Sequence, residues 1–185
     1  MKDKLGIARW GVLLALVTLL YGYGLGMTFG GAEEQLKAKL AAGGATWVEA
    51  QVSNSKSSTT AAGLAKVRAK AESDSAKVVE KSWIYMKRAH LHANGLGTSA
   101  LALIMLLALS GASDRRLRFT ALALGLGALG YSSFWMFAGF MAPELGSTGK
   151  AKEALIILAG PSSLLCVGGL ISVLAGIVSG TREKP

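Results

Sequence analysis

Four long stretches of this chain contain no Asp, Glu, Lys or Arg, and this pattern constrains the fold more than any other feature. An α-helix of about 20 apolar residues crosses a ~30 Å hydrocarbon core. Charged residues make up only 17% of the chain, well below the roughly 25% of a soluble domain. The sequence therefore predicts an all-α integral membrane protein with four transmembrane helices, in the charge-free stretches 10–32, 89–113, 119–143 and 154–180.

The segment between the first two spans is polar and is expected to lie outside the membrane. Glu33 to Ala42 has a helical composition, Gly43 and Gly44 are expected to break that helix, and Val52 to Thr60 has the composition of a turn. From Ala61 onward a helix can run unbroken into the second span. We expect a helical hairpin here, with a ligand-binding domain as the alternative. The expected organisation is a first span (1–32), an outward-facing helical insert (33–88) and a three-helix transmembrane bundle (89–185).

The distribution of basic residues predicts the topology. Eight Lys and Arg residues lie in the short segments at the two termini and between the second and third spans, whereas the loop between the third and fourth spans carries only Lys150 and Lys152. The positive-inside rule therefore places both termini in the cytoplasm and the insert, with Trp47 and Ser57, outside. The ten basic residues of the insert are discordant, but long loops obey the rule weakly. We expect a multi-pass protein of the inner (cytoplasmic) membrane.

The first span resembles a signal peptide at its basic start, yet its apolar character continues through Phe29, and no small-residue cleavage site follows its apolar core directly. We expect a retained anchor, with a cleaved signal peptide as the alternative. The net charge of +9 lies mainly beside the spans, where it favours contact with lipid headgroups, so we expect no nucleic-acid partner. The single Cys166 allows no intrachain disulfide. Little chain remains outside the spans and the insert, so we expect no separate catalytic domain.

Glycines and aromatic residues in the spans predict packing and interface contacts. Gly22 and Gly26 are four residues apart, so they can admit a close helix neighbour. Three glycines of the third span, Gly125, Gly127 and Gly130, are expected to thin one side of it. The aromatic residues that follow, from Phe134 to Phe140, are typical of an aromatic belt at the membrane surface.

The only two histidines, His90 and His92, form the one candidate site for chemistry. Ionisable side chains in a span usually face a bundle interior, water or a cofactor, although both rings could also be hydrated in the headgroup zone. Residues two apart on a helix point about 200° away from each other, so the pair cannot chelate one ion from a regular helix. His90 shares a face with Asn94, which can fix the tautomer of an imidazole. The candidate cofactor-binding residues are His92, His90 and Asn94, and the candidate metal ligands are His92 and His90.

The segment Arg88-Ala89-His90-Leu91-His92-Ala93-Asn94-Gly95-Leu96-Gly97 resembles the His-rich helix start of haem-copper oxidase catalytic subunits, especially of the cbb3-type and nitric-oxide-reductase branch. It is also similar to a His-x-His-x-Asn segment of small oxidase-like membrane proteins. The resemblance implies that His92 is a haem b ligand. The chain departs from such a subunit because it has four spans and no further histidine, so it cannot reduce oxygen by itself.

Two functions are therefore expected. One is a small subunit or accessory protein of a bacterial membrane complex of the respiratory kind, linked to haem, quinone or copper, with electron transfer as its role. The alternative is a packing or assembly factor, or a small transporter component, that binds no cofactor. The sequence leans towards a role that is not catalytic on its own. The expected partners are the lipid bilayer and either other membrane subunits or further copies of this chain.

Overall fold

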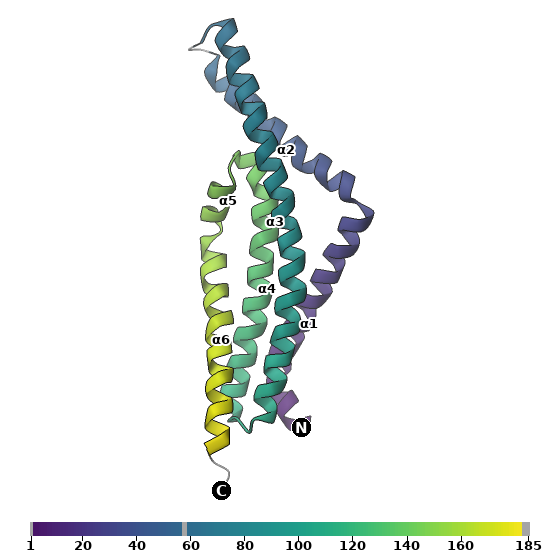
Figure 1. Cartoon of the computed structure of the whole chain (residues 1–185), viewed down its shortest axis with the longest axis vertical. Helices are drawn as coiled ribbons and strands as arrows, with labels where there is room; N and C mark the ends of the chain where they lie inside the picture. Colours follow the sequence, from purple (N-terminus) through teal and green to yellow (C-terminus); the bar gives the residue numbers. More distant parts are fainter. Residues whose placement is uncertain (1, 57–58, 183–185) are drawn as a thin grey trace. The chain divides into compact units, whose positions relative to one another are not determined.

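The computed structural model of this chain describes residues 2–56 and 59–182, which form helices and contain no strand (Figure 1). Four of the helices, α1, α3, α4 and α6, are long and apolar enough to cross a membrane. The predicted fold class, an all-α membrane protein with four spans and a helical hairpin between the first two, is confirmed. The helices are α1 (Lys2–Gly31), α2 (Glu33–Ser55), α3 (Ala61–Leu109), α4 (Asp114–Leu145), α5 (Thr148–Ala154) and α6 (Ile156–Arg182).

The contacts within the chain divide it into two compact units. The span unit contains residues 1–26, 89–134 and 157–185, and the hairpin unit contains residues 27–88 and 135–156. Four helices contribute to both units: α1, α3 and α4, and also α6 through its first residue, Ile156. The organisation expected from the sequence, with boundaries at 33 and 89, stays a prediction.

In the span unit, α4 packs between α1 and α6. The backbone of Gly11 in α1 lies directly against Ala121 of α4, and Gly125 faces α1 one turn later. Gly127 and Gly130 instead face α6, where a Cβ on either residue would collide with atoms of that helix. The prediction that the three glycines thin one side of the span is therefore wrong. They let two different helices approach α4, because Gly125 and Gly127 are about 200° apart around the helix.

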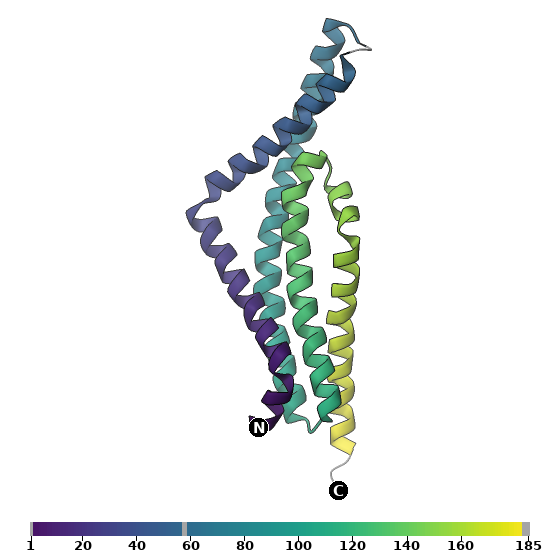
Figure 2. The ribbon, with the colours of Figure 1, turned by 180° about the vertical axis from the view of Figure 1, so that it is seen from behind.

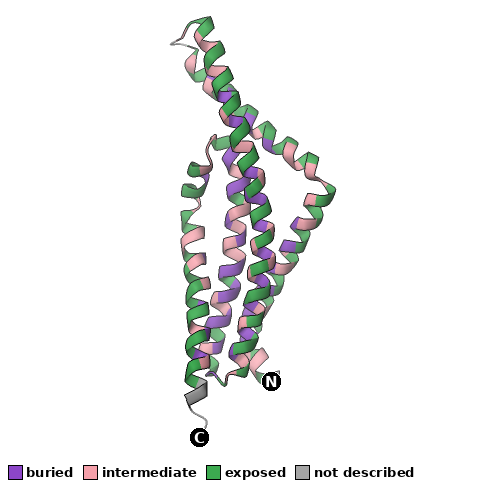
Figure 3. Cartoon of the chain, in the orientation of Figure 1, coloured by how far each residue is buried: buried purple, intermediate pink, exposed green. Residues whose placement is uncertain are grey.

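Alanines make up about half of the core of the span unit, beside Ile104, Leu107, Leu117, Leu124 and Val173, and large apolar residues cover its surface. Ala15, Ala121 and Ala128 are almost completely buried. Ile157 and Leu164 are 81% and 75% exposed, and buried residues lie where the helices face one another (Figure 3). Membrane helices pack in this way because lipid tails are as apolar as Leu, so association depends on close contact between small residues. The exposed apolar surface fits contact with a lipid bilayer.

In the hairpin unit, α2 runs back along the first part of α3 (Figure 2). The predicted break at Gly43 and Gly44 is wrong, since α2 continues through both residues to Ser55. Gly44 is buried against the side chains of Ser75 and Val79 of α3. A glycine costs roughly 1 kcal/mol of helix propensity, but here it allows two helices to approach closely.

An ion pair links the two arms of the hairpin. The Arg68 guanidinium donates to both carboxylate oxygens of Glu49, at 2.6 and 3.0 Å. The hydrogen bond from Arg68 lowers the pKa of the Glu49 carboxyl. The link is therefore complete above the ordinary pKa of a glutamate and is lost as the pH falls through the lowered value. Because both side chains are solvent-accessible, its contribution to stability is small.

The two ends of the hairpin unit differ from the expected connections. The turn predicted at Val52 to Thr60 begins later, because α2 ends at Ser55. The third helix extends slightly beyond the predicted stretch 119–143, since α4 runs from Asp114 to Leu145, and the short helix α5 was not expected from the sequence. Ser147 is the N-cap residue of α5, and its hydroxyl accepts a hydrogen bond from the Lys150 amide at 3.3 Å.

The topology stays a prediction that labelling can test. α3 has 49 residues, so it is roughly 70 Å long and extends well beyond a ~30 Å hydrocarbon core. Ser57 lies outside the described residues, but Ser73 on α3 and Ser113 between α3 and α4 are both exposed. In a Cys166→Ala background, we expect an impermeant thiol reagent to label Ser73→Cys in intact spheroplasts and Ser113→Cys only after permeabilisation. The reverse pattern would contradict the cytoplasmic location of the termini.

Candidate functional site

The histidine segment lies within α3, which continues through Gly95 and Gly97 without a break. Gly97 is buried, and a Cβ there would lie 2.9 Å from the Leu19 side chain of α1. Gly95 is exposed and has nothing within 4 Å of its Cβ position. The two glycines thus differ in role, and the one that faces α1 allows α1 and α3 to come into close contact beside the histidines.

His90 is hydrogen-bonded to the backbone of α1. Its Nδ1 lies 2.7 Å from the carbonyl oxygen of Gly22. A carbonyl can only accept, so Nδ1 carries the proton and donates it, and Nε2 is left as the acceptor of the neutral ring. This bond selects one tautomer of His90 and connects α1 to α3 at a point where the two helices touch.

Asn94 follows His90 by one helical turn, and its side chain lies against the same ring. The Asn94 amide nitrogen is 3.2 Å from Nδ1 and 3.5 Å from Nε2 of His90. Because Nδ1 is the donor to Gly22, only Nε2 can accept from this amide, at a long distance. The Asn94 Oδ1 atom is buried and has no hydrogen-bond partner within the described residues. A Cβ on Gly22 would lie 2.5 Å from this oxygen.

Two glycines of α1 make room for these side chains. A Cβ on Gly26 would be 2.7 Å from Cε1 of His90, and a Cβ on Gly22 would meet both Ala93 and Asn94. The prediction that Gly22 and Gly26 admit a close helix neighbour is confirmed, and α3 is that neighbour. Gly24 lies between them on another face and has nothing within 4 Å of its Cβ position.

His92 contacts a different helix. Its ring is half-buried and meets Tyr131 of α4 edge to face, with the centroids 5.1 Å apart and an angle of 71° between the planes. Tyr131 in turn lies 6.1 Å from the ring of Phe134. His90 therefore faces α1 and His92 faces α4, in agreement with the divergence that their spacing predicts.

The remaining potential ligands do not join the histidines. Within residues 2–56 and 59–182, no group of three or more His, Cys, Asp or Glu side chains could hold one metal ion. Cys166 is half-buried in α6 and lines an apolar cavity of about 510 Å³ between α3, α4 and α6. None of the residues that line this cavity is a histidine.

Two elements of the site were not expected from the sequence. The first is the Gly22 carbonyl, a backbone group that no residue pattern marks as an acceptor. The second is Tyr131, which the sequence places at the same end of the bundle as His92 without indicating a contact. Gly22 and Gly26 were the one sequence feature that could have indicated the contact with α1. Two glycines on one face of a helix leave space that a larger side chain of a neighbouring helix can fill.

Comparisons of this chain with protein-family models, with curated proteins and with solved structures find no match. The resemblance of the histidine segment to haem-copper oxidase subunits therefore rests on its ten residues alone.

Proposed function

We propose that this chain is a small accessory subunit of a larger membrane complex and that His90 serves to hold its helices together. The observation that supports the structural role of His90 is the 2.7 Å contact between its Nδ1 and the Gly22 carbonyl, and the large apolar side chains exposed on the span unit support the accessory role. A polar group inside a membrane is costly unless it is paired, and a pairing across two helices also contributes to their association. His90, which the sequence marks as a candidate cofactor ligand, would thus stabilise the packing of α1 on α3.

Two further pairs of polar groups in the span unit also connect neighbouring helices. The hydroxyls of Thr120 in α4 and Ser172 in α6 lie 2.6 Å apart. At the end of the unit, Lys4 of α1 pairs with Asp114 of α4 at 2.6 Å. These two pairs connect helices of the span unit, and many large apolar side chains are exposed on the same helices. A surface of this kind suits lipid or the helices of a partner subunit.

Site-specific photo-crosslinking in the native membrane tests this role. Leu164 and Ile171 are exposed on one face of α6, whereas Val173 is almost completely buried. We expect a crosslinker at either exposed position to form an adduct with the same partner protein, and the matched crosslinker at Val173 to form none. The proposal fails if the exposed positions crosslink only to lipid or to further copies of this chain.

A second candidate, haem b binding, comes from the resemblance and depends on His92. His90 and Asn94 do not fit this group, because α1 lies directly over the imidazole: a Cβ on Gly26 would be 2.7 Å from Cε1 and 3.5 Å from Nε2. No space for a porphyrin remains on that side. His92 is half-buried and oriented by Tyr131, so it is the histidine that would ligate the iron. A bound haem b would supply one-electron transfer, and any further histidine that held it would come from another chain, because His90 and His92 are the two histidines of this one.

An absorption spectrum with and without dithionite tests the haem candidate in the purified complex. We expect His92→Ala to abolish the Soret band and His90→Ala to retain most of it, because only the first substitution removes the ligand. If the complex shows no Soret band, or if neither substitution changes it, the haem candidate fails. The accessory role with a structural His90 does not depend on this result.

A further inference from the structure

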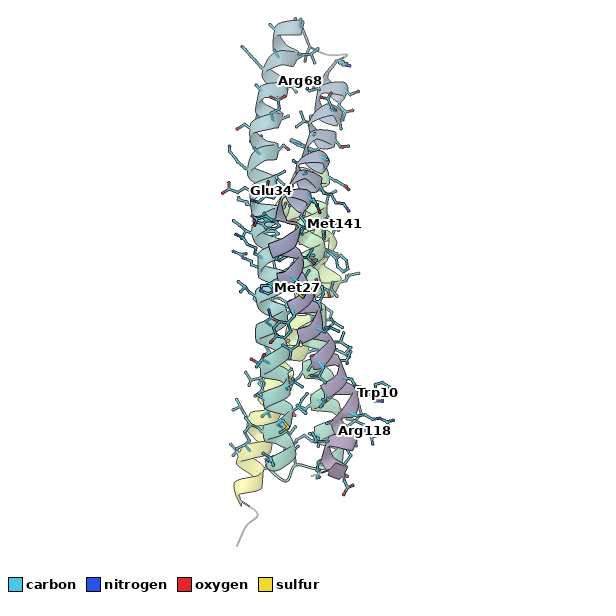
Figure 4. The ribbon with its side chains drawn as sticks, turned by 90° about the vertical axis from the view of Figure 1, so that its right-hand side faces the viewer. Trp10, Met27, Glu34, Arg68, Arg118 and Met141 are labelled. Atoms are coloured by element: carbon cyan, nitrogen blue, oxygen red, sulfur yellow. The ribbon has the colours of Figure 1, made fainter. Side chains whose placement is uncertain are left out.

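We infer that the end of the span unit that carries the N-terminus holds the phosphate group of an anionic phospholipid between Arg9 of α1 and Arg118 of α4. The two helices enclose a cavity of about 620 Å³ there, lined by both arginines and by Trp10. Figure 4 shows the Trp10 and Arg118 side chains next to each other at this end. This site is independent of the histidine segment and of the proposed accessory role.

The close packing of α1 and α4 brings the two arginines to the same level. Gly11 lies against Ala121, and Lys4 pairs with Asp114, so the two helices run in the same direction. Arg9 and Arg118 are respectively two and three residues before the Gly11–Ala121 contact. They are also the last charged residues before the apolar parts of their helices. A membrane would therefore place both guanidinium groups at the level of the lipid headgroups.

The charges of the cavity favour an anion. Within the described residues neither Arg9 nor Arg118 forms an ion pair, whereas the nearby Lys4 is paired with Asp114. Among the described residues that line the cavity, Asp3 is the only acidic one, so two cations face one carboxylate. The Arg9 guanidinium lies 5.3 Å from the centre of the Trp10 ring, a contact that leaves its N–H groups available. A guanidinium fork matches phosphate oxygens and binds them with charge-assisted hydrogen bonds.

The surface beyond the cavity suits the acyl chains of the same molecule. On α1, the exposed residues Leu13 and Val17 follow Trp10 on one face. On α4, Leu122 and Leu126 follow Arg118 at intervals of four residues, and Leu126 is also exposed. Residues at these spacings form one stripe on each helix. A phosphate bound by the arginines would thus have its hydrocarbon tails beside two apolar stripes, which identifies a phospholipid rather than a free phosphate ion as the ligand.

Native mass spectrometry of the detergent-solubilised full chain tests this inference. Phosphatidylglycerol, phosphatidylcholine and inorganic phosphate are titrated separately. We expect phosphatidylglycerol to be retained most strongly and the variant Arg9→Gln/Arg118→Gln to bind it at least about tenfold more weakly, since two charge-assisted hydrogen-bonding groups are lost. Both side chains are exposed, so the variant should fold. An unchanged melting temperature would verify this.

The matched control removes the same charge from the same end of α4. Arg115 and Arg116 do not line the cavity, so Arg115→Gln/Arg116→Gln should retain wild-type binding. The variant Arg9→Lys/Arg118→Lys keeps the charge, and we expect it to bind with intermediate strength because a lysine lacks the planar fork. Equal weakening in the control would overturn the site, since the effect would then be one of overall charge. Equal binding of phosphatidylcholine or of inorganic phosphate would overturn the choice of an anionic phospholipid.

Discussion

The substitution Gly11→Ala is expected to destabilise the bundle more than any other single methyl group added to α1. The new Cβ would collide with the backbone carbon and oxygen of Ala121, as well as with its side chain. A flexible side chain can move away from such a contact, but the backbone of α4 cannot move without separating the two helices. We expect a loss of about 2–3 kcal/mol, the upper part of the range for overpacking a close-packed interior.

Thermal unfolding in detergent, followed by circular dichroism and size-exclusion chromatography, measures this effect. Gly24→Ala is the matched control on the same helix, because nothing lies within 4 Å of its Cβ position. It should be neutral or stabilise by up to about 1 kcal/mol, the gain in helix propensity. Adding Ala121→Gly to Gly11→Ala should restore only part of the stability, since two of the three atoms in contact belong to the backbone. Equal behaviour of the Gly11 and Gly24 variants would show that α1 does not pack on α4 in this way.

The spans and the hairpin could be predicted because they follow from local properties of the sequence. A charge-free stretch such as 119–143 can only be buried or lie in lipid, and a run of helix-forming residues from Ala61 onward has no breaker. The same local reasoning failed at Gly43 and Gly44. Their low helix propensity is real, but the contact of Gly44 with Ser75 and Val79 outweighs it. That contact joins residues about 30 positions apart, and helical periodicity does not report on it.

Part of the candidate site could be predicted, because that part depends on the geometry of a single helix. The shared face of His90 and Asn94 and the divergence of His90 and His92 follow from the geometry of one helix. The choice of partner does not: His90 bonds to a carbonyl that lies 68 residues away in the sequence. The contacts of the α4 glycines could not be predicted either. Gly125 lies against α1 and Gly127 against α6, and the spacing of the two residues does not identify these neighbours.

The hydrogen bond from His90 to α1 leads to the second large expected effect. His90→Ala removes the donor to the Gly22 carbonyl and the acceptor that faces the Asn94 amide, and it leaves a space beneath Gly26. Hydrogen bonds between membrane helices contribute about 0.6 kcal/mol on average and less than about 2 kcal/mol. The lost packing adds to this, so we expect a destabilisation of about 2 kcal/mol. His92→Ala loses an edge contact of a half-buried ring with Tyr131 and should cost less than about 1 kcal/mol.

A double-mutant cycle with Gly26→Ala distinguishes a direct contact of His90 with α1 from a general loss of stability. In the wild-type protein the added methyl group would lie 2.7 Å from Cε1 of His90, so Gly26→Ala should be destabilising. In the His90→Ala background the same methyl group enters the vacated space, and the substitution should be neutral or stabilising. We expect a coupling energy of about 1–2 kcal/mol, within the range for residues in contact. The pair Gly24→Ala and His90→Ala, which are not in contact, should be additive within about 0.5 kcal/mol. Additivity of the Gly26 pair as well would mean that the His90 ring does not lie beneath α1, and the structural role proposed for it would then be wrong.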